Sequence, residues 1–128
     1  MPFVTIYVRS GCDDLAVETS MRQITQAGED ILENTLKRMV RVSFFETDAR
    51  RVYTAGEYEP ELSPLVLFRI GPGRSANAKD LFMKKICEIL CTNLGCRPEN
   101  VHSYIMDNEE GFHFCIGGKP KDFGKQVK

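Results

Sequence analysis

Apolar residues gather in four strand-like runs along the chain. Residues 3–8 (FVTIYV) are apolar and rich in β-branched side chains, which is typical of a buried strand. Residues 64–70 (PLVLFRI), 40–46 (VRVSFFE) and 101–107 (VHSYIMD) have the same character. The stretch 55–64 (AGEYEPELSP) carries glycine and proline, so we expect it to link regular elements.

Two segments between these runs have the period of amphipathic helices. In the first, a stripe with spacings of four and three is formed by Val17, Met21, Ile24, Gly28 and Ile31. In the second, the stripe is formed by Phe82, Ile86, Ile89, Leu90 and Leu94. Asp13 and Ser75 stand where helix N-caps belong. We expect Arg97-Pro98 to end the second helix, because proline cannot continue one.

The two halves of the chain align without gaps at an offset of 62 residues. The matched pairs are Pro2 with Pro64, Val4 with Val66, Gly11 with Gly73, Met21 with Met83, Ile24 with Ile86, and Gly56 with Gly118. We interpret residues 2–57 and 64–118 as two copies of one strand–helix–strand unit. Both copies are expected to belong to a single domain that spans residues 1–128.

The repeated unit predicts the fold class. A strand–helix–strand unit forms a right-handed crossover with parallel strands. Two units can pair into one four-stranded mixed sheet, and because each helix has a single apolar stripe, both helices should cover the same face. This is an α/β (α+β) fold with one bare face. Since the strands are apolar on both faces, we expect a symmetric oligomer in which bare faces meet.

Composition narrows the class of protein and its partners. The chain has 128 residues and a net charge of −1, which gives no global attraction for nucleic acid or an anionic membrane. No window reaches the length of a membrane span, and the N-terminus lacks the features of a secretion signal. Five cysteines without a CxxC pair indicate neither a disulfide framework nor a zinc site. The expected compartment is a reducing cytoplasm.

Pro2 is the first candidate for chemistry. If Met1 is removed, Pro2 becomes a free secondary amine at the end of a buried strand. Burial and nearby guanidinium groups disfavour the protonated form of an amine. An unprotonated amine can remove a proton next to a carbonyl group and return it elsewhere. The alternative is structural, because proline is also tolerated at the first residue of a strand.

Two arginines and two aromatic residues are further candidates. Arg41 lies inside an apolar strand, where a guanidinium group needs a partner or a cavity. Arg74 lies in IGPGRS before a helix, where it can hold a carboxylate by two parallel hydrogen bonds. Either arginine can instead be a salt-bridge partner. Phe114 can line a pocket or belong to the core, and Tyr104 can reach a site through its hydroxyl group.

The order of these residues resembles the tautomerase superfamily over nearly the whole chain, in a fused, two-copy form similar to 4-oxalocrotonate tautomerase. The marks are a proline after Met, VRV in the second strand, GRS at a strand–helix junction, and HFxIGG near the end. In this chain they are Pro2, Val40-Arg41-Val42, Gly73-Arg74-Ser75, and His113-Phe114-Cys115-Ile116-Gly117-Gly118.

The resemblance implies a fold, a reaction and roles for the residues. It implies a β-α-β sandwich like that of macrophage migration inhibitory factor, assembled as a homotrimer. The implied reaction is keto–enol tautomerisation of a small carboxylate-bearing 2-oxo acid by an isomerase that needs no metal or organic cofactor. Pro2 would act as base and then acid, and Arg74 would hold the substrate carboxylate. Arg41 would stabilise the enolate oxygen across a subunit boundary, and Phe114 would form an apolar wall.

The gapless alignment also predicts one site per chain. Copy one has Cys12 at the position of Arg74, and copy two has Ser103 at the position of Arg41. Pro64 is internal, so its nitrogen is an amide and cannot serve as a base.

Other activities on the same plan stay open. A relative of cis-3-chloroacrylic acid dehalogenase would hydrate or dehalogenate an unsaturated acid, and Tyr104 matches that pattern. Gly71 and Gly28 replace its extra arginine and its helix histidine, and Glu110 or Asp107 would have to supply its acid. A decarboxylase similar to malonate semialdehyde decarboxylase and a non-catalytic, cytokine-like trimer are further alternatives.

Overall fold

Each half of the chain forms the predicted strand–helix–strand unit. The computed structural model describes residues 2–107 and 114–121. The first unit comprises β1 (Phe3–Arg9), α1 (Asp14–Ile31) and β2 (Arg41–Thr47). The second comprises β5 (Leu65–Ile70), α2 (Ala76–Leu94) and β6 (His102–Asp107). Three short 3-10 turns, at Lys37–Met39, Ala49–Arg51 and Pro98–Asn100, lie in the connections.

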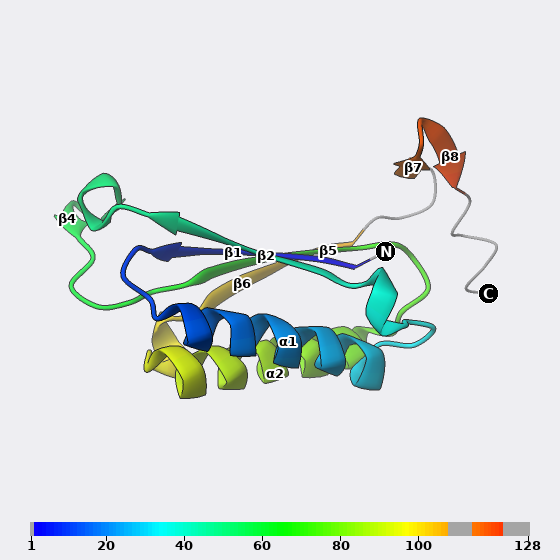
Figure 1. Cartoon of the computed structure of the whole chain (residues 1–128), viewed down its shortest axis with the longest axis horizontal. Helices are drawn as coiled ribbons and strands as arrows, with labels where there is room; N and C mark the ends of the chain where they lie inside the picture. Colours follow the sequence, from blue (N-terminus) through cyan, green and yellow to red (C-terminus); the bar gives the residue numbers. More distant parts are fainter. Residues whose placement is uncertain (1, 108–113, 122–128) are drawn as a thin grey trace.

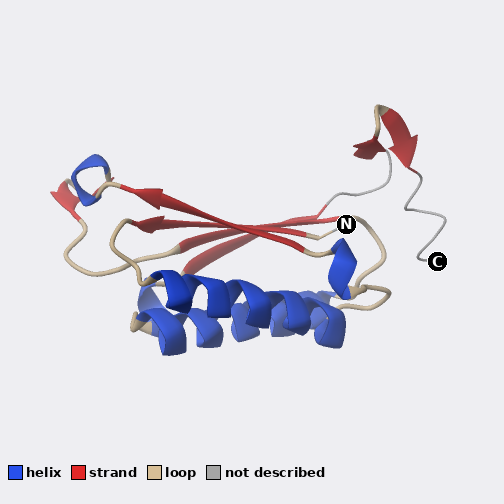
Figure 2. Ribbon diagram, in the orientation of Figure 1, coloured by secondary structure: helices blue, strands red, loops and turns tan. Residues whose placement is uncertain are grey.

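The two units share one sheet with the strand order β2-β1-β5-β6. Within each unit the strands are parallel, and β1 and β5 join the units in antiparallel pairing. Both helices cover one face of this sheet, and the opposite face carries no helix (Figures 1 and 2). The predicted four-stranded mixed sheet with two helices on one face is therefore confirmed. In the part of the chain that the structure describes, no helix is long and apolar enough to cross a membrane.

The core lies between the sheet and the helices. Alternate strand residues such as Ile6 and Phe68 are fully buried against helix residues such as Ile24 and Phe82. The rings of Phe68 and Phe82 meet edge to face with their centroids 5.0 Å apart, a favoured aromatic geometry. The buried strand residues and the apolar faces of the two helices thus pack together in one apolar layer.

The helix caps explain where the helices begin and end. The Asp13 side chain accepts a hydrogen bond from the Ala16 amide at 3.1 Å, and Ser75 does the same for Ala78 at 3.1 Å, so both predicted N-caps are confirmed. The expected end of the second helix at Arg97-Pro98 was wrong. The helix stops at Leu94 because Gly95 adopts the left-handed conformation with φ 74°, which favours glycine.

A short hairpin follows the second strand of each unit. The first consists of β3 (Tyr53–Thr54) and β4 (Glu57–Tyr58), and it extends into the stretch that we expected to be a link. The second consists of β7 (Phe114–Ile116) and β8 (Lys119–Lys121). Tyr53 pairs with Tyr58 and Cys115 pairs with Pro120, which are the same two positions at the 62-residue offset. The repeat therefore includes the hairpins.

The alignment of the second strands needed a correction. Phe3 pairs with Arg41 in the first unit, and Leu65 pairs with His102 in the second. Leu65 follows Phe3 by 62 residues, whereas His102 follows Arg41 by 61. The same shift appears in the backbone, because the Arg41 amide donates to the Pro2 carbonyl at 3.0 Å and the His102 amide donates to the Pro64 carbonyl at 3.1 Å. His102, not Ser103, therefore occupies the place of Arg41.

Candidate active site

Pro2 lies at the start of a central strand and is fully buried. It continues the alternation of Val4 and Ile6, which point toward the helices. Its carbonyl accepts the Arg41 amide, which fixes the first residue of β2 beside it. The proline nitrogen is therefore anchored by a packed ring and a paired backbone, next to the strand that carries the predicted Arg41.

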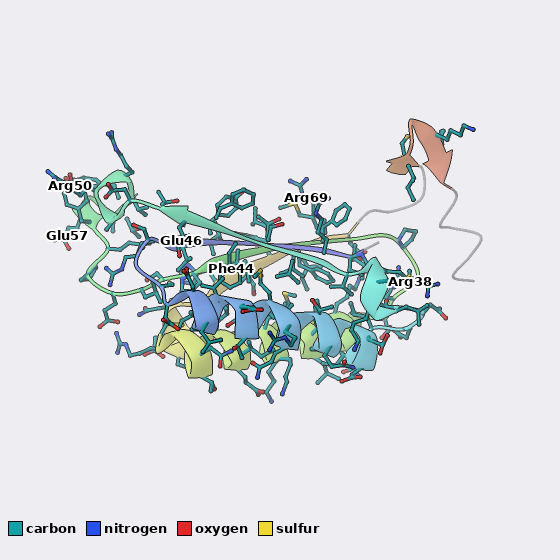
Figure 3. The ribbon with its side chains drawn as sticks, in the orientation of Figure 1. Arg38, Phe44, Glu46, Arg50, Glu57 and Arg69 are labelled. Atoms are coloured by element: carbon teal, nitrogen blue, oxygen red, sulfur yellow. The ribbon has the colours of Figure 1, made fainter. Side chains whose placement is uncertain are left out.

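Two arginines flank this strand on the face away from the helices, which we call the open face. Phe3 pairs with Arg41 on one side and with Arg69 on the other, so all three residues project to the open face in one row. Figure 3 shows Arg69 on the side of the sheet away from the helices. Strand spacing places the two arginine Cα atoms about 10 Å apart. Both arginines are exposed, and neither has an ion-pair partner among the described residues.

Sequence reasoning missed Arg69. The signal is present in the strand LVLFRI, in which Arg69 is the charged residue and alternates with the buried Phe68 and Ile70. Arg41 in VRVSFF carries the same signal. Pairing across the sheet was the additional information, because it places Arg69 in the row of Phe3 and Arg41.

Arg74 is directed into the protein. Its side chain is buried, with 7% of its surface exposed. Nε donates to the Glu33 carbonyl at 3.0 Å, and Nη2 donates to the Asn34 carbonyl at 3.3 Å and to the Thr35 hydroxyl at 3.0 Å. Burial lowers the pKa of the Arg74 guanidinium. Arg74 therefore ties the loop after α1 to the start of α2.

The Glu33 carboxylate completes this junction. It accepts the Ser75 amide at 3.1 and 3.3 Å, and interactions with the side chain and then the backbone of Ser75 lower the pKa of Glu33. Nη1 of Arg74 makes no hydrogen bond to any described residue. The hydrogen bonds of Nε and Nη2 thus hold the guanidinium group in place, and Nη1 can donate to another acceptor.

The strand order and the paired helices can be compared with known proteins. No protein-family model matches the sequence, and no curated protein matches it. Among solved structures, a fused 4-OT that forms a wild-type asymmetric trimer aligns with a TM-score of 0.83 at 20% identity, over 92% of this chain and 94% of that chain. This chain has the fold of that fused 4-OT.

Two further solved structures have the same fold. Pt0534 inactivated by 2-oxo-3-pentynoate aligns with a TM-score of 0.82 at 15% identity, over 92% of this chain and 95% of that chain. A member of the cis-3-chloroacrylic acid dehalogenase family aligns with a TM-score of 0.80 at 23% identity, over 97% of this chain and 87% of that chain. The likeness thus covers both halves of the chain.

The structure describes the remaining predicted site residues to different extents. Tyr104 is exposed on the open face and pairs with Leu67, two residues along the strand from Arg69. Phe114 begins β7, and its side chain lies outside the described part of the structure, as do His113 and Glu110. Asp107 forms an ion pair with Lys79 and makes no contact with Arg74 among the described hydrogen bonds and ion pairs. The acid that a hydratase requires is therefore not supplied to Arg74 by Asp107.

Proposed function

We propose that this chain is a tautomerase that interconverts the enol and keto forms of a small 2-oxo acid, with Pro2 as general base and then acid after removal of Met1. The observation that carries the proposal is the position of Pro2. A buried proline begins a central strand, and the two adjacent strands present Arg41 and Arg69 beside it. An amine in such a partly desolvated, cationic environment favours its neutral form.

The proposed chemistry is a proton transfer that balances without a further reactant. The Pro2 nitrogen takes the proton of the enol hydroxyl group, and the electron pair moves toward the adjacent carbon as the carbonyl group forms. The protonated nitrogen then returns a proton to that carbon. Arg41 stabilises negative charge on the oxygen during the transfer. We assign to Phe114 the role of an apolar wall and to Tyr104 that of a hydroxyl donor toward the substrate.

The substrate carboxylate requires a cation of its own, and two arginines are suited to this. Arg74 offers Nη1 while its other nitrogens hold the loop at Glu33–Thr35. Arg69 offers a whole guanidinium group on the open face. We assign the carboxylate to both arginines, with Arg69 as the one that is accessible in the described structure.

The open face supports assembly as a homotrimer. It exposes aromatic side chains, including Tyr7 at 40%, Phe45 at 52% and Tyr104 at 63%. Tyr7 and Phe45 stack with their centroids 5.5 Å apart, which forms a continuous aromatic surface across two strands. Such a surface is typical of a protein interface. The fused 4-OT with the same fold is a trimer, which supports the same assembly here.

Covalent labelling tests whether Pro2 carries a reactive amine. In 2-oxo-3-pentynoate an alkyne is conjugated to a ketone, so a neutral amine adds to the alkyne. The nitrogen forms a bond to one alkyne carbon and loses its proton to solvent, and the other alkyne carbon takes up a proton from solvent. We expect intact mass to show loss of Met1 and the gain of one reagent mass, with Pro2 as the labelled residue. Retention of Met1 or labelling elsewhere would favour a non-catalytic trimer. The inactivation of Pt0534 by this reagent supports the choice.

Arg69→Ala tests the assignment of the carboxylate. We expect KM for phenylenolpyruvate to rise by about tenfold or more, since a charged hydrogen bond contributes about 1.5–3 kcal/mol, with a smaller effect on kcat. Arg50→Ala is the matched control, because Arg50 is exposed near the opposite end of the sheet (Figure 3). Equal KM values for the two variants would remove Arg69 from the site.

A further inference from the structure

A cavity of about 460 Å³ lies at the opposite end of β1 from Pro2. Its walls include Pro64 at the start of β5, Tyr7 and Arg9 at the end of β1, and His102 at the start of β6. The hairpin formed by β3 and β4 closes another side with Tyr58. The volume is within the range of cavities that hold small molecules.

The lining of this cavity is the internal counterpart of the Pro2 site. Pro64 corresponds to Pro2, because each accepts the amide of the first residue of the neighbouring parallel strand. That residue is His102 at one end and Arg41 at the other. Tyr7 pairs with Leu65 as Arg69 pairs with Phe3, so Tyr7 takes the place of Arg69. The cavity therefore lies at the end of the sheet that corresponds, through the repeat, to the Pro2 end.

The chemistry of the two ends differs at the nitrogen. Pro64 follows Ser63 in the chain, so its nitrogen belongs to a peptide bond and has no basic electron pair. A molecule in this cavity would be held without the proton transfer that we propose at Pro2. The cavity is therefore suited to binding rather than to the same catalysis.

The cavity is lined by a cationic side chain from β1 and by carboxylates from the side of the β3–β4 hairpin. Arg9 is half-buried, and its Nη1 donates to the Glu59 carbonyl at 3.2 Å, which leaves its other nitrogens for a ligand. His102 adds an imidazole from β6. Glu57 and Glu59 add carboxylates from the hairpin side, and the Thr54 hydroxyl donates to Glu59 Oε1 at 3.3 Å. A ligand that carries only a negative charge would be attracted by Arg9 and repelled by the two carboxylates, whereas a ligand with both charges can pair with both.

We propose that this cavity binds a small zwitterion of the amino-acid class with an aromatic side chain, and that it does so without turnover. The ligand carboxylate pairs with Arg9 and His102. Its ammonium group pairs with the carboxylates of Glu57 and Glu59. The rings of Tyr7 and Tyr58, both of which line the cavity, contact the aromatic side chain. The binding does not require the proposed chemistry at Pro2, and Tyr7 belongs both to this cavity and to the open face at which we propose assembly.

Titration of the full-length protein with three related probes tests the proposal. The probes are L-phenylalanine, phenylpyruvate, which lacks the ammonium group, and phenethylamine, which lacks the carboxylate. The chain has two histidines, so the NMR signals of the His102 ring are assigned with His102→Gln. We expect L-phenylalanine to shift these signals to saturation, and each of the other probes to bind at least about tenfold more weakly, because each lacks one charged group and its contacts.

Variants separate this cavity from the Pro2 site. We expect Arg9→Ala to weaken L-phenylalanine binding at least about tenfold and Glu57→Gln to weaken it as well. Arg22→Ala, which changes an exposed arginine on α1, should leave binding unchanged, and so should Pro2→Ala. His102 signals that do not respond to L-phenylalanine, or equal affinities for the three probes, would overturn the proposal. Binding that is lost in Pro2→Ala would place the ligand at the other site. Glu57 is exposed, so Glu57→Gln keeps the test valid if Arg9→Ala does not fold.

Discussion

Replacement of Pro2 with alanine is expected to lower kcat/KM for phenylenolpyruvate by about 10²- to 10⁴-fold, the usual contribution of a positioned general base. Alanine also permits removal of Met1, so a free amine remains. That amine has lost the ring that is buried against the core, and it is no longer fixed beside Arg41 and Arg69. The measurement is the rate of enol disappearance in the wild type and the variant, after intact mass has established the N-terminus of each.

Pro64→Ala is the matched control for this experiment. Pro64 is also fully buried, immediately precedes β5 as Pro2 precedes β1, and accepts the corresponding backbone hydrogen bond. Its loss from the core should cost a similar amount of stability, whereas its amide nitrogen has no part in the proposed proton transfer. We expect kcat/KM of Pro64→Ala to stay within about threefold of the wild type, which is less than 1 kcal/mol. Equal losses in the two variants would assign both effects to packing and would reject Pro2 as the base.

Replacement of Arg74 with alanine is expected to lower the free energy of unfolding by about 3 kcal/mol, because buried hydrogen bonds to a charged group are lost together. The affected acceptors are the carbonyls of Glu33 and Asn34 and the hydroxyl of Thr35. Lysine has one charged nitrogen and cannot reproduce the planar arrangement, so Arg74→Lys should recover only part of the loss. Urea unfolding at neutral pH provides the measurement.

An exposed arginine provides the comparison for Arg74. Arg97 forms ion pairs with Glu61 and Glu99, and 62% of its side-chain surface is exposed. Exposed ion pairs contribute about 0–1 kcal/mol, so Arg97→Ala should change stability much less than Arg74→Ala. If the two substitutions have the same effect, the loop contacts of Arg74 do not hold the junction. A rise in KM for Arg74→Lys, measured under conditions in which the variant is folded, would support the additional contact of Nη1 with substrate.

The hydrophobic pattern by itself determined the elements and their layering. The alternation of apolar residues in 3–8, and the apolar stripes that contain Ile24 in the first helix and Phe82 in the second, depend only on which side chains avoid water. They therefore predict the strands, the helices and their buried faces. The N-caps at Asp13 and Ser75 were equally predictable, because a short polar side chain satisfies the first free amides of a helix. These are local properties, and the repeat at an offset of 62 residues reinforced them.

Tertiary structure alone decided the register and the direction of the charged side chains. Sequence alignment placed Ser103 opposite Arg41, whereas the hydrogen bond from the His102 amide to Pro64 shifts the strand by one residue. A shift of one residue exchanges the two faces of a strand, so the alignment could not assign the faces of β6, the strand that carries Tyr104. The burial of Arg74 under the loop and the row formed by Phe3, Arg41 and Arg69 depend on contacts between distant segments. Such contacts are made only when the chain has folded, and a residue's own neighbours in the sequence do not encode them.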